Sequence, residues 1–363
     1  MTQNSYTRFY LFYMGVLICI SLFGIFFLYS ASYTLSGDQS ALALKQFVRI
    51  GIGLLVFTGV VSIGYKAFLN VSYLLYAAAL LLLVMVIAVG TERYGAQRWL
   101  YLGPFGFQPS EFAKLAVLLA LSHYLGKRKR NLYQMKRFVI AFVLTVVPLI
   151  LILKQPDLGT ALIFLPILFC MLYLWGAKLK YFLVTFCLGI ASTPFLWFML
   201  KPYQRDRLLS FINPNTDPLG SSYTVIQSKI GIGSGGLLGK GWLCGTQNKL
   251  DFIPEHHTDF IFSVVGEEGG FIAVLIFFLL FFLLFRLSFK VIRKTTDMSG
   301  RLLAAGIISM VFFHFFINIG MTIGIMPVTG LPLPLVSYGG SSIVNFFIAF
   351  GLLVSIYKER SIF

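Results

Sequence analysis

Long apolar stretches alternate with short polar segments along nearly the whole chain. A helix needs roughly 20 mainly apolar residues to cross the hydrocarbon core of a bilayer, so each long stretch predicts one membrane-spanning helix. We therefore expect an all-α polytopic membrane protein with ten transmembrane helices, forming a single domain over residues 1–363. The ten stretches are 10–30, 47–64, 69–90, 109–126, 137–154, 159–176, 181–200, 259–286, 302–326 and 341–357.

Composition supports a membrane protein. Hydrophobic residues make up 58% of the chain and charged residues only 12%, against about 25% charged residues in soluble domains. The first stretch is too long for the apolar region of a signal peptide and lacks a small-residue cleavage site, so we expect a retained helix. The four cysteines, Cys19, Cys170, Cys187 and Cys244, have neither metal-ligand nor paired-disulfide spacing.

The basic residues predict how the helices are oriented. Lys and Arg collect in cytoplasmic loops, so the basic segments place both termini in the cytoplasm. The net charge of +16 then reflects topology and attraction to anionic lipids rather than nucleic-acid binding. The cytoplasmic basic residues are Arg8, Lys66, Lys127, Arg128, Lys129, Arg130, Lys136, Arg137, Lys178, Lys180, Arg286, Lys290, Arg293, Lys294, Arg301, Lys358 and Arg360.

One outward segment is much longer than the other connections. Residues 201–258 form a large extracytoplasmic loop before the eighth helix, with the Gly-rich run GIGSGGLLGKGW at 231–242. Loops of this length in a compact protein are usually functional or disordered, and the aromatic and aliphatic residues here argue against disorder. Residues 222–232 are compatible with a short amphipathic helix at the membrane interface.

A first polar cluster precedes and enters the fourth stretch. It contains Arg98, Gln108, Ser110, Glu111 and Lys114. A proline followed by Ser110 predicts a helix start capped by Ser110. Glu111 and Lys114 are three residues apart, so on a helix they share a face and can pair. Such a pair is compatible both with a structural role and with lining a site.

Two further polar segments lie on the outward side. Asp157, in the turn QPDLGT, either caps the next helix or takes part directly in the chemistry. The loop 326–342 is so rich in Pro and Gly that it must be buried in protein or line a wet cleft. Its Ser337 precedes a helix restart at Ser341, which could present N–H groups to an anion. The adjacent acids at 267–268 lie inside a span and must face a cavity, a partner or the inner interface.

The densest polar run ends where the eighth stretch begins. We favour Asp259 as a base, because partial desolvation at this boundary raises the pKa of a carboxyl group. An N-cap role for Thr258 or Asp259 is the alternative, and adjacent histidines on a helix do not face each other as metal ligands. The run includes Lys240, Gln247, Glu255, His257, Thr258 and Asp259.

The residues alone favour group transfer from a lipid-linked phosphate, with a carboxylate base and nearby cations. A transporter is the rival, but it predicts mid-membrane charges and repeated broken helices, whereas these charges concentrate at the outer mouth. The runs RWLYLGPFGFQPSEFAK, QPDLGTA, DPLGSSYTVIQSKIGIGSGGLLGKGW, GTQNKLDFIPEHHTDFIFSVVGEEGG and GLPLPLVSYGGSS resemble the SEDS family (shape, elongation, division and sporulation). Thr329, where the division branch typically has Lys, makes the chain more similar to the elongation branch.

The resemblance implies a peptidoglycan glycosyltransferase that polymerises lipid II during elongation and shape maintenance, in the bacterial cytoplasmic membrane. It places the catalytic role on Asp259 of the HTDF motif and implies a class B penicillin-binding protein as partner. No cofactor is certain, although a divalent cation (Mg²⁺ or Mn²⁺) is compatible with this chemistry. A lipid II flippase, the division paralogue or a structural scaffold are the alternatives. Lys114, Arg98, Arg205 and Lys240 are the candidate cations for the leaving group.

Overall fold

The computed structural model describes most of the chain. Of the predicted cytoplasmic basic residues, Arg128, Lys129, Arg130 and Arg360 lie outside the described part. The described residues are 3–34, 37–38, 40–93, 96–102, 105–127, 134–213, 220 and 222–359.

Each of the ten predicted stretches contains a long helix, so the prediction of an all-α membrane protein is confirmed. Eight of these helices are long and apolar enough to cross a membrane. The count of ten stays a prediction, because α5 carries charges in its first turns and the apolar part of α8 is short. The helices are α1 (Gln3–Ala31), α2 (Ser40–Ile63), α4 (Ser72–Val89), α5 (Pro109–Gly126), α6 (Gln134–Lys154), α7 (Leu158–Trp175), α8 (Leu179–Met199), α12 (Ile261–Lys294), α13 (Met298–Thr322) and α14 (Gly340–Glu359).

Shorter elements occupy the connections. The residue pattern predicts no strands, but the segment before α5 forms a small antiparallel sheet in which β4 pairs with both β3 and β5. Its aromatic-rich run suits a strand. The predicted helix near 222–232 is confirmed as α10. The short elements are β1 (Tyr33–Thr34), β2 (Gly37–Asp38), α3 (Tyr65–Asn70), β3 (Thr91–Arg93), β4 (Ala96–Leu102), β5 (Phe105–Phe107), α9 (Pro202–Ile212), α10 (Tyr223–Ser234) and α11 (Thr246–Lys249).

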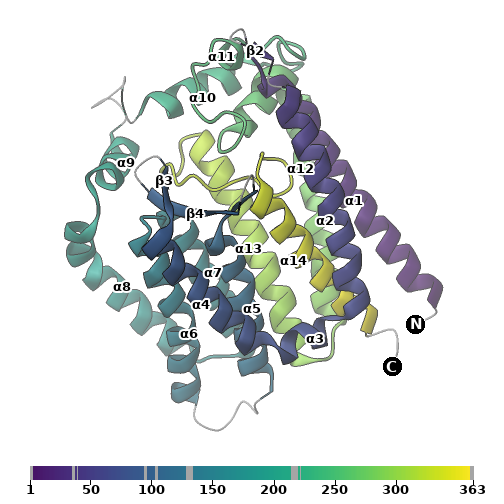
Figure 1. Ribbon diagram of the computed structural model, residues 1–363, viewed down its shortest axis with the longest axis vertical. Helices are drawn as coiled ribbons and strands as arrows, with labels where there is room; N and C mark the ends of the chain where they lie inside the picture. The colour runs from purple at the N-terminus through teal and green to yellow at the C-terminus, as the bar shows by residue number, and fades with distance from the viewer. Residues whose placement is uncertain are drawn as a thin grey trace.

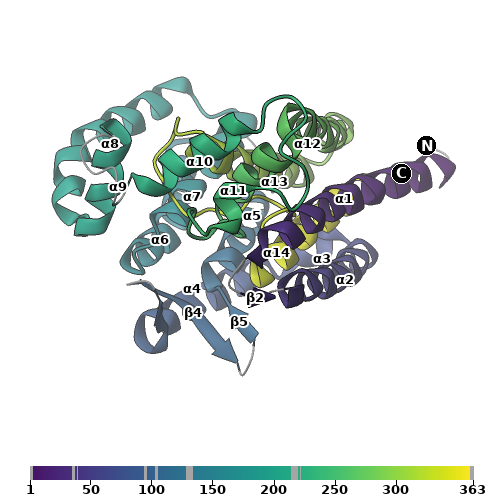
Figure 2. The same cartoon turned by 90° about the horizontal axis from the view of Figure 1, so that it is seen from above.

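Helix α13 forms the centre of the bundle. It packs against α5, α7, α12 and α14, while α2 packs against α14 and α1 against α12. Both chain ends lie near the same end of the bundle, and α10 and α11 cover the opposite end (Figure 1). Helices α8 and α9 lie at the periphery in both views (Figures 1 and 2). The outward end of the bundle is therefore built from loops and short helices that rest on the ends of long ones.

The adjacent acids at the start of α12 hold the outward loop in place. Glu267 Oε1 accepts hydrogen bonds from Lys240 Nζ (2.6 Å), from Thr246 N (2.8 Å) and from Gln247 N (3.1 Å). Glu268 Oε1 accepts one from Ser30 Oγ of α1 (2.6 Å). Of the three alternatives left open by the sequence, a cavity, a partner or the inner interface, these carboxylates face partner groups, which belong mainly to the loop of the same chain.

We predict that Glu267→Ala releases this loop, because the ammonium group of Lys240 and two backbone N–H groups lose their acceptor together. Chymotryptic cleavage beside the exposed Leu237 and Leu238 should then become faster under native conditions. Asp206→Asn, which removes an exposed acid from α9, is the matched control. Unchanged cleavage in Glu267→Ala would contradict a holding role for this carboxylate.

Candidate active site

Asp259 lies in the turn directly before α12. The N-cap of this helix is Phe260, and no side chain caps the helix. Neither Thr258 nor Asp259 therefore acts as the N-cap, which had been the alternative to a chemical role. The Asp259 side chain is half-buried and makes no capping bond to α12.

Contacts from helix α13 and the last loop fix this turn. The side-chain amide of Asn318, in α13, donates to the carbonyl oxygens of Asp259 (2.8 Å) and Leu331 (2.7 Å). Ser337 Oγ donates to the Thr258 carbonyl, and Tyr338 N donates to the carbonyl of His257 (3.0 Å). The turn and the Pro- and Gly-rich loop therefore form one hydrogen-bonded unit.

The last loop passes directly beside the carboxylate. Gly330 has a φ of 70°, and a Cβ atom at this position would lie 3.3 Å from Asp259 Oδ2. Glycine tolerates this left-handed conformation without strain. Gly330 thus lets the backbone of the loop form one wall around the Asp259 carboxylate.

Four charged groups act on Asp259. Burial, together with the negative charge of Glu255, raises the pKa of Asp259 to about 7. Arg207 and Arg98 act in the opposite direction, and the charge of Asp157 adds a small rise. A carboxylate with a pKa near neutral pH is a stronger base than an ordinary aspartate while still being substantially ionised at pH 7.

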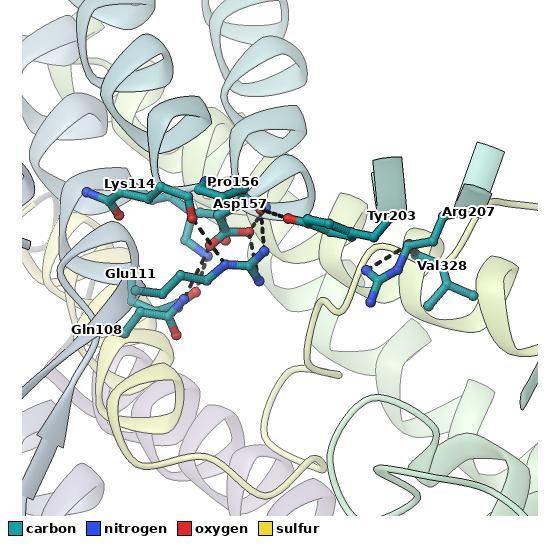
Figure 3. Close-up of polar contacts among 11 residues, drawn as sticks. Gln108, Glu111, Lys114, Pro156, Asp157, Tyr203, Arg207 and Val328 are labelled. Carbon is teal, nitrogen blue, oxygen red and sulfur yellow. Dashed lines mark hydrogen bonds and ion pairs between the residues drawn. The ribbon is translucent and has the colours of Figure 1, made fainter. Parts of the chain in front are cut away.

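The start of α7 forms the opposite side of the site. Asp157 is the N-cap of α7 and accepts from Thr160 N (3.2 Å), so the predicted capping role is confirmed. Its carboxylate also accepts from Gln108 Nε2 (3.4 Å) and lies 3.8 Å from Arg98 Nη1. Figure 3 shows Gln108 and Asp157 together on one side of this region. Capping orients the Asp157 carboxylate.

Helix α9 contributes a cation that the sequence analysis missed. Arg207 Nη1 donates to the Val328 carbonyl (3.4 Å), and its guanidinium lies 5.7 Å from the centre of the Tyr203 ring. Tyr203 Oη donates to the Pro156 carbonyl (2.9 Å), which connects α9 to the start of α7 (Figure 3). Arg205, the predicted residue, donates instead to the Phe198 carbonyl (2.9 Å). Arg205 and Arg207 are two residues apart, so they point to different sides of α9. The residue pattern alone does not show which side faces Asp259.

A buried charged unit lies beneath this region. Lys114 Nζ lies 2.7 Å from Glu111 Oε1 and 2.7 Å from His314 Nε2, and all three side chains are buried. The predicted Glu111–Lys114 pair is confirmed. The predicted capping role of Ser110 is wrong, because Gln108 is the N-cap of α5 and no side chain caps the helix. Proline occupies N1, so the cap position falls two residues earlier than the sequence pattern suggested.

The other predicted residues divide between two places. Lys240 and Gln247 contact Glu267 on the far side of the α12 start. Glu255 accepts from Thr258 Oγ1 (3.0 Å) and lies 3.8 Å from His257 Nε2. Burial and the neighbouring His256 lower the pKa of His257, which favours the neutral imidazole.

The beginning of α14 is joined to the small sheet. Ser341 Oγ accepts from Gln108 N (3.2 Å) and donates to the Gly106 carbonyl (3.2 Å). Among the described residues, no group of three or more His, Cys, Asp or Glu side chains is arranged to hold a metal ion. The arrangement offers one carboxylate base, two guanidinium groups and several helix N-termini to an anionic substrate.

Comparison with known proteins identifies related chains. The FtsW, RodA and SpoVE family model, described as a cell cycle protein family, matches residues 10–362. Peptidoglycan glycosyltransferase MrdB of Escherichia coli (strain K12) is 40% identical, over 95% of this chain and 92% of its own. Peptidoglycan glycosyltransferase RodA of Treponema pallidum (strain Nichols) is 36% identical, over 95% and 96%. A solved chain from a peptidoglycan synthase complex that coordinates polymerization and crosslinking has a TM-score of 0.82 at 37% identity, over 96% and 97%.

We predict strong coupling between Glu111 and Lys114. Glu111→Ala or Lys114→Ala alone should each lower the free energy of unfolding by about 3–5 kcal/mol, since a lone buried charge remains. The double variant should lose much less than the sum, because no unpaired charge is left. Denaturant unfolding of the four proteins in one detergent measures this difference. Additivity within about 0.5 kcal/mol would mean that the two side chains do not interact.

Proposed function

This chain belongs to the FtsW, RodA and SpoVE family, and we propose that it polymerises lipid II with Asp259 as general base. Its activity is that of a peptidoglycan glycosyltransferase of the MrdB and RodA type. Thr329, where the division branch typically has Lys, supports a role in cell elongation and shape maintenance. The observation that carries the base assignment is the position of Asp259 in a turn held through its backbone carbonyl by Asn318, with a pKa raised to about 7 and two arginines acting on it.

The proposed reaction transfers a glycosyl group between lipid-linked substrates. Asp259 removes the proton from the 4-hydroxyl group of the acceptor sugar, and that oxygen forms a bond to the anomeric carbon of the donor. The bond from the anomeric carbon to the diphosphate oxygen breaks, and its electron pair leaves with undecaprenyl diphosphate. The proton on Asp259 then passes to water, which restores the base.

Two arginines are placed to act on the leaving group. Negative charge develops on the diphosphate oxygens as the bond breaks, and fixed cations stabilise that charge. Arg98 and Arg207 both act electrostatically on Asp259. We assign Lys114, Arg205 and Lys240 to shaping the site, because the charges that act on Asp259 include Arg98 and Arg207 but none of these three. Among the described residues, no group of three or more His, Cys, Asp or Glu side chains is placed to hold a divalent ion.

The setting of the enzyme follows from the same features. The chain is a polytopic membrane protein. We place it in the bacterial cytoplasmic membrane with Asp259 on the outer side, because the basic loops favour the inner, cytoplasmic side. A class B penicillin-binding protein is its proposed partner. This proposal draws on the related chain solved within a synthase complex that coordinates polymerization and crosslinking.

We predict that Asp259→Asn lowers lipid II polymerisation by about 10²- to 10⁴-fold, the usual contribution of a general base. Purified protein, with and without the partner, is incubated with lipid II in detergent, and glycan chains are separated by length. Asp206→Asn is the matched control and should polymerise normally. Wild-type rates in Asp259→Asn would exclude the proposed base. Transport of lipid II across vesicles without any glycan would instead support a flippase.

We predict that kcat/KM rises with pH through about 7, because only ionised Asp259 accepts the proton. Glu255→Gln removes a negative charge that raises this pKa, so the midpoint should move to lower pH. Arg207→Gln should move it to higher pH. Asp251→Asn, an exposed acid that does not act on Asp259, is the control. Identical midpoints in all four proteins would show that a group other than Asp259 controls the profile.

A further inference from the structure

A groove lies between the first half of α1 and the second half of α12, at the end of these helices away from Asp259. It consists of two cavities of about 620 Å³ and 690 Å³. Both are lined by Arg8 and Phe12, so they form one continuous groove. Figure 1 shows this part of α1 at the edge of the bundle, where lipid has access.

The groove changes character along its length. The part nearer the membrane centre is lined by side chains such as Leu11, Val16 and Leu283. The part nearer the helix ends is lined by polar groups that include Asn4 and Lys290. An apolar channel that opens between polar and basic side chains matches a molecule with a hydrocarbon tail and a charged head.

The mouth of the groove is positive and has no acid of its own. Residues 3–31 and 271–294 contain no Asp or Glu. Among the described residues, neither Arg8 nor Lys290 takes part in an ion pair, and Lys290 Nζ lies 5.7 Å from the centre of the Phe9 ring. Basic pockets between transmembrane helices on the cytoplasmic side suit anionic lipid headgroups. Charge complementarity therefore selects an anionic occupant.

The floor of the groove has room for an acyl chain. A Cβ atom at Gly15 would have no other atom within 4 Å. A glycine at a buried helix contact usually allows a neighbouring helix to pack closely. Gly15 instead leaves open space beside Cys19 in the groove wall. The absent side chain thus widens the apolar part at about the depth of acyl carbons.

We propose that this groove binds one anionic glycerophospholipid of the cytoplasmic leaflet. The phosphate lies at Arg8 and Lys290, and one acyl chain runs along Gly15 towards Cys19. The site is separate from the active site and does not depend on the reaction proposed for it.

Native mass spectrometry of the purified full chain in mild detergent tests this site. The protein is titrated with phosphatidylglycerol or with phosphatidylethanolamine of the same acyl chains. The wild-type protein should retain one phosphatidylglycerol with a clear preference over phosphatidylethanolamine. The double variant Arg8→Gln/Lys290→Gln should bind it about 20- to 30-fold more weakly, since each basic residue contributes about fivefold.

A matched control separates a specific site from general charge. Arg286→Gln/Arg293→Gln removes the same charge from exposed positions of α12 outside the groove lining and should leave retention within about twofold of wild type. Gly15→Leu keeps the charges but fills the apolar floor, and it should also weaken retention. Equal losses in both double variants, or equal retention of the two lipids by the wild type, would overturn the proposal in favour of ordinary surrounding lipid.

Discussion

The side-chain amide of Asn318 joins the two irregular outward segments that build the active site. Its two N–H bonds go to the carbonyl oxygens of Asp259 and Leu331, so one residue of a membrane helix serves both the turn before α12 and the Pro- and Gly-rich loop. Irregular backbone at the membrane is stable only when protein groups satisfy its hydrogen bonds. The position of the Asp259 carboxylate beside Gly330 therefore depends on a polar residue in a largely apolar helix.

The negative charges near Asp259 partly offset the effect of the two arginines on its pKa. A lone arginine beside a carboxylate would form a tight pair and lower its pKa, which would weaken the base. Here Arg98 lies 3.8 Å from Asp157, and Glu255 adds a negative charge beside Asp259. Asp157 and Glu255 thus offset part of the effect of the arginines on Asp259. The guanidinium groups remain able to stabilise a diphosphate, whose charge exceeds that of one carboxylate.

The sequence was sufficient for features that depend on local spacing or on hydrophobicity. Apolar length predicted the long helices, three-residue spacing predicted the Glu111–Lys114 pair, and the turn around Asp157 predicted a cap. It was insufficient where distant segments meet. The use of Arg207 rather than Arg205 depends on how α9 rests on Pro156 through Tyr203. Asn318 had a signal, since an amide inside an apolar run is unusual, but its partners are 59 and 13 residues away along the chain.

Five long helices begin at the outward face, namely α2, α5, α7, α12 and α14. A chain with a cytoplasmic N-terminus starts every second span outside, so the bundle itself brings helix N-termini to this side. Hydrogen bonds between Gln108 and Ser341 and between Gln108 and Asp157 tie three of these ends together. Each N-terminus carries partial positive charge, which favours phosphate. The apolar helices therefore contribute more than anchorage. Their common direction supplies a positive field at the place where the loops hold the carboxylate base.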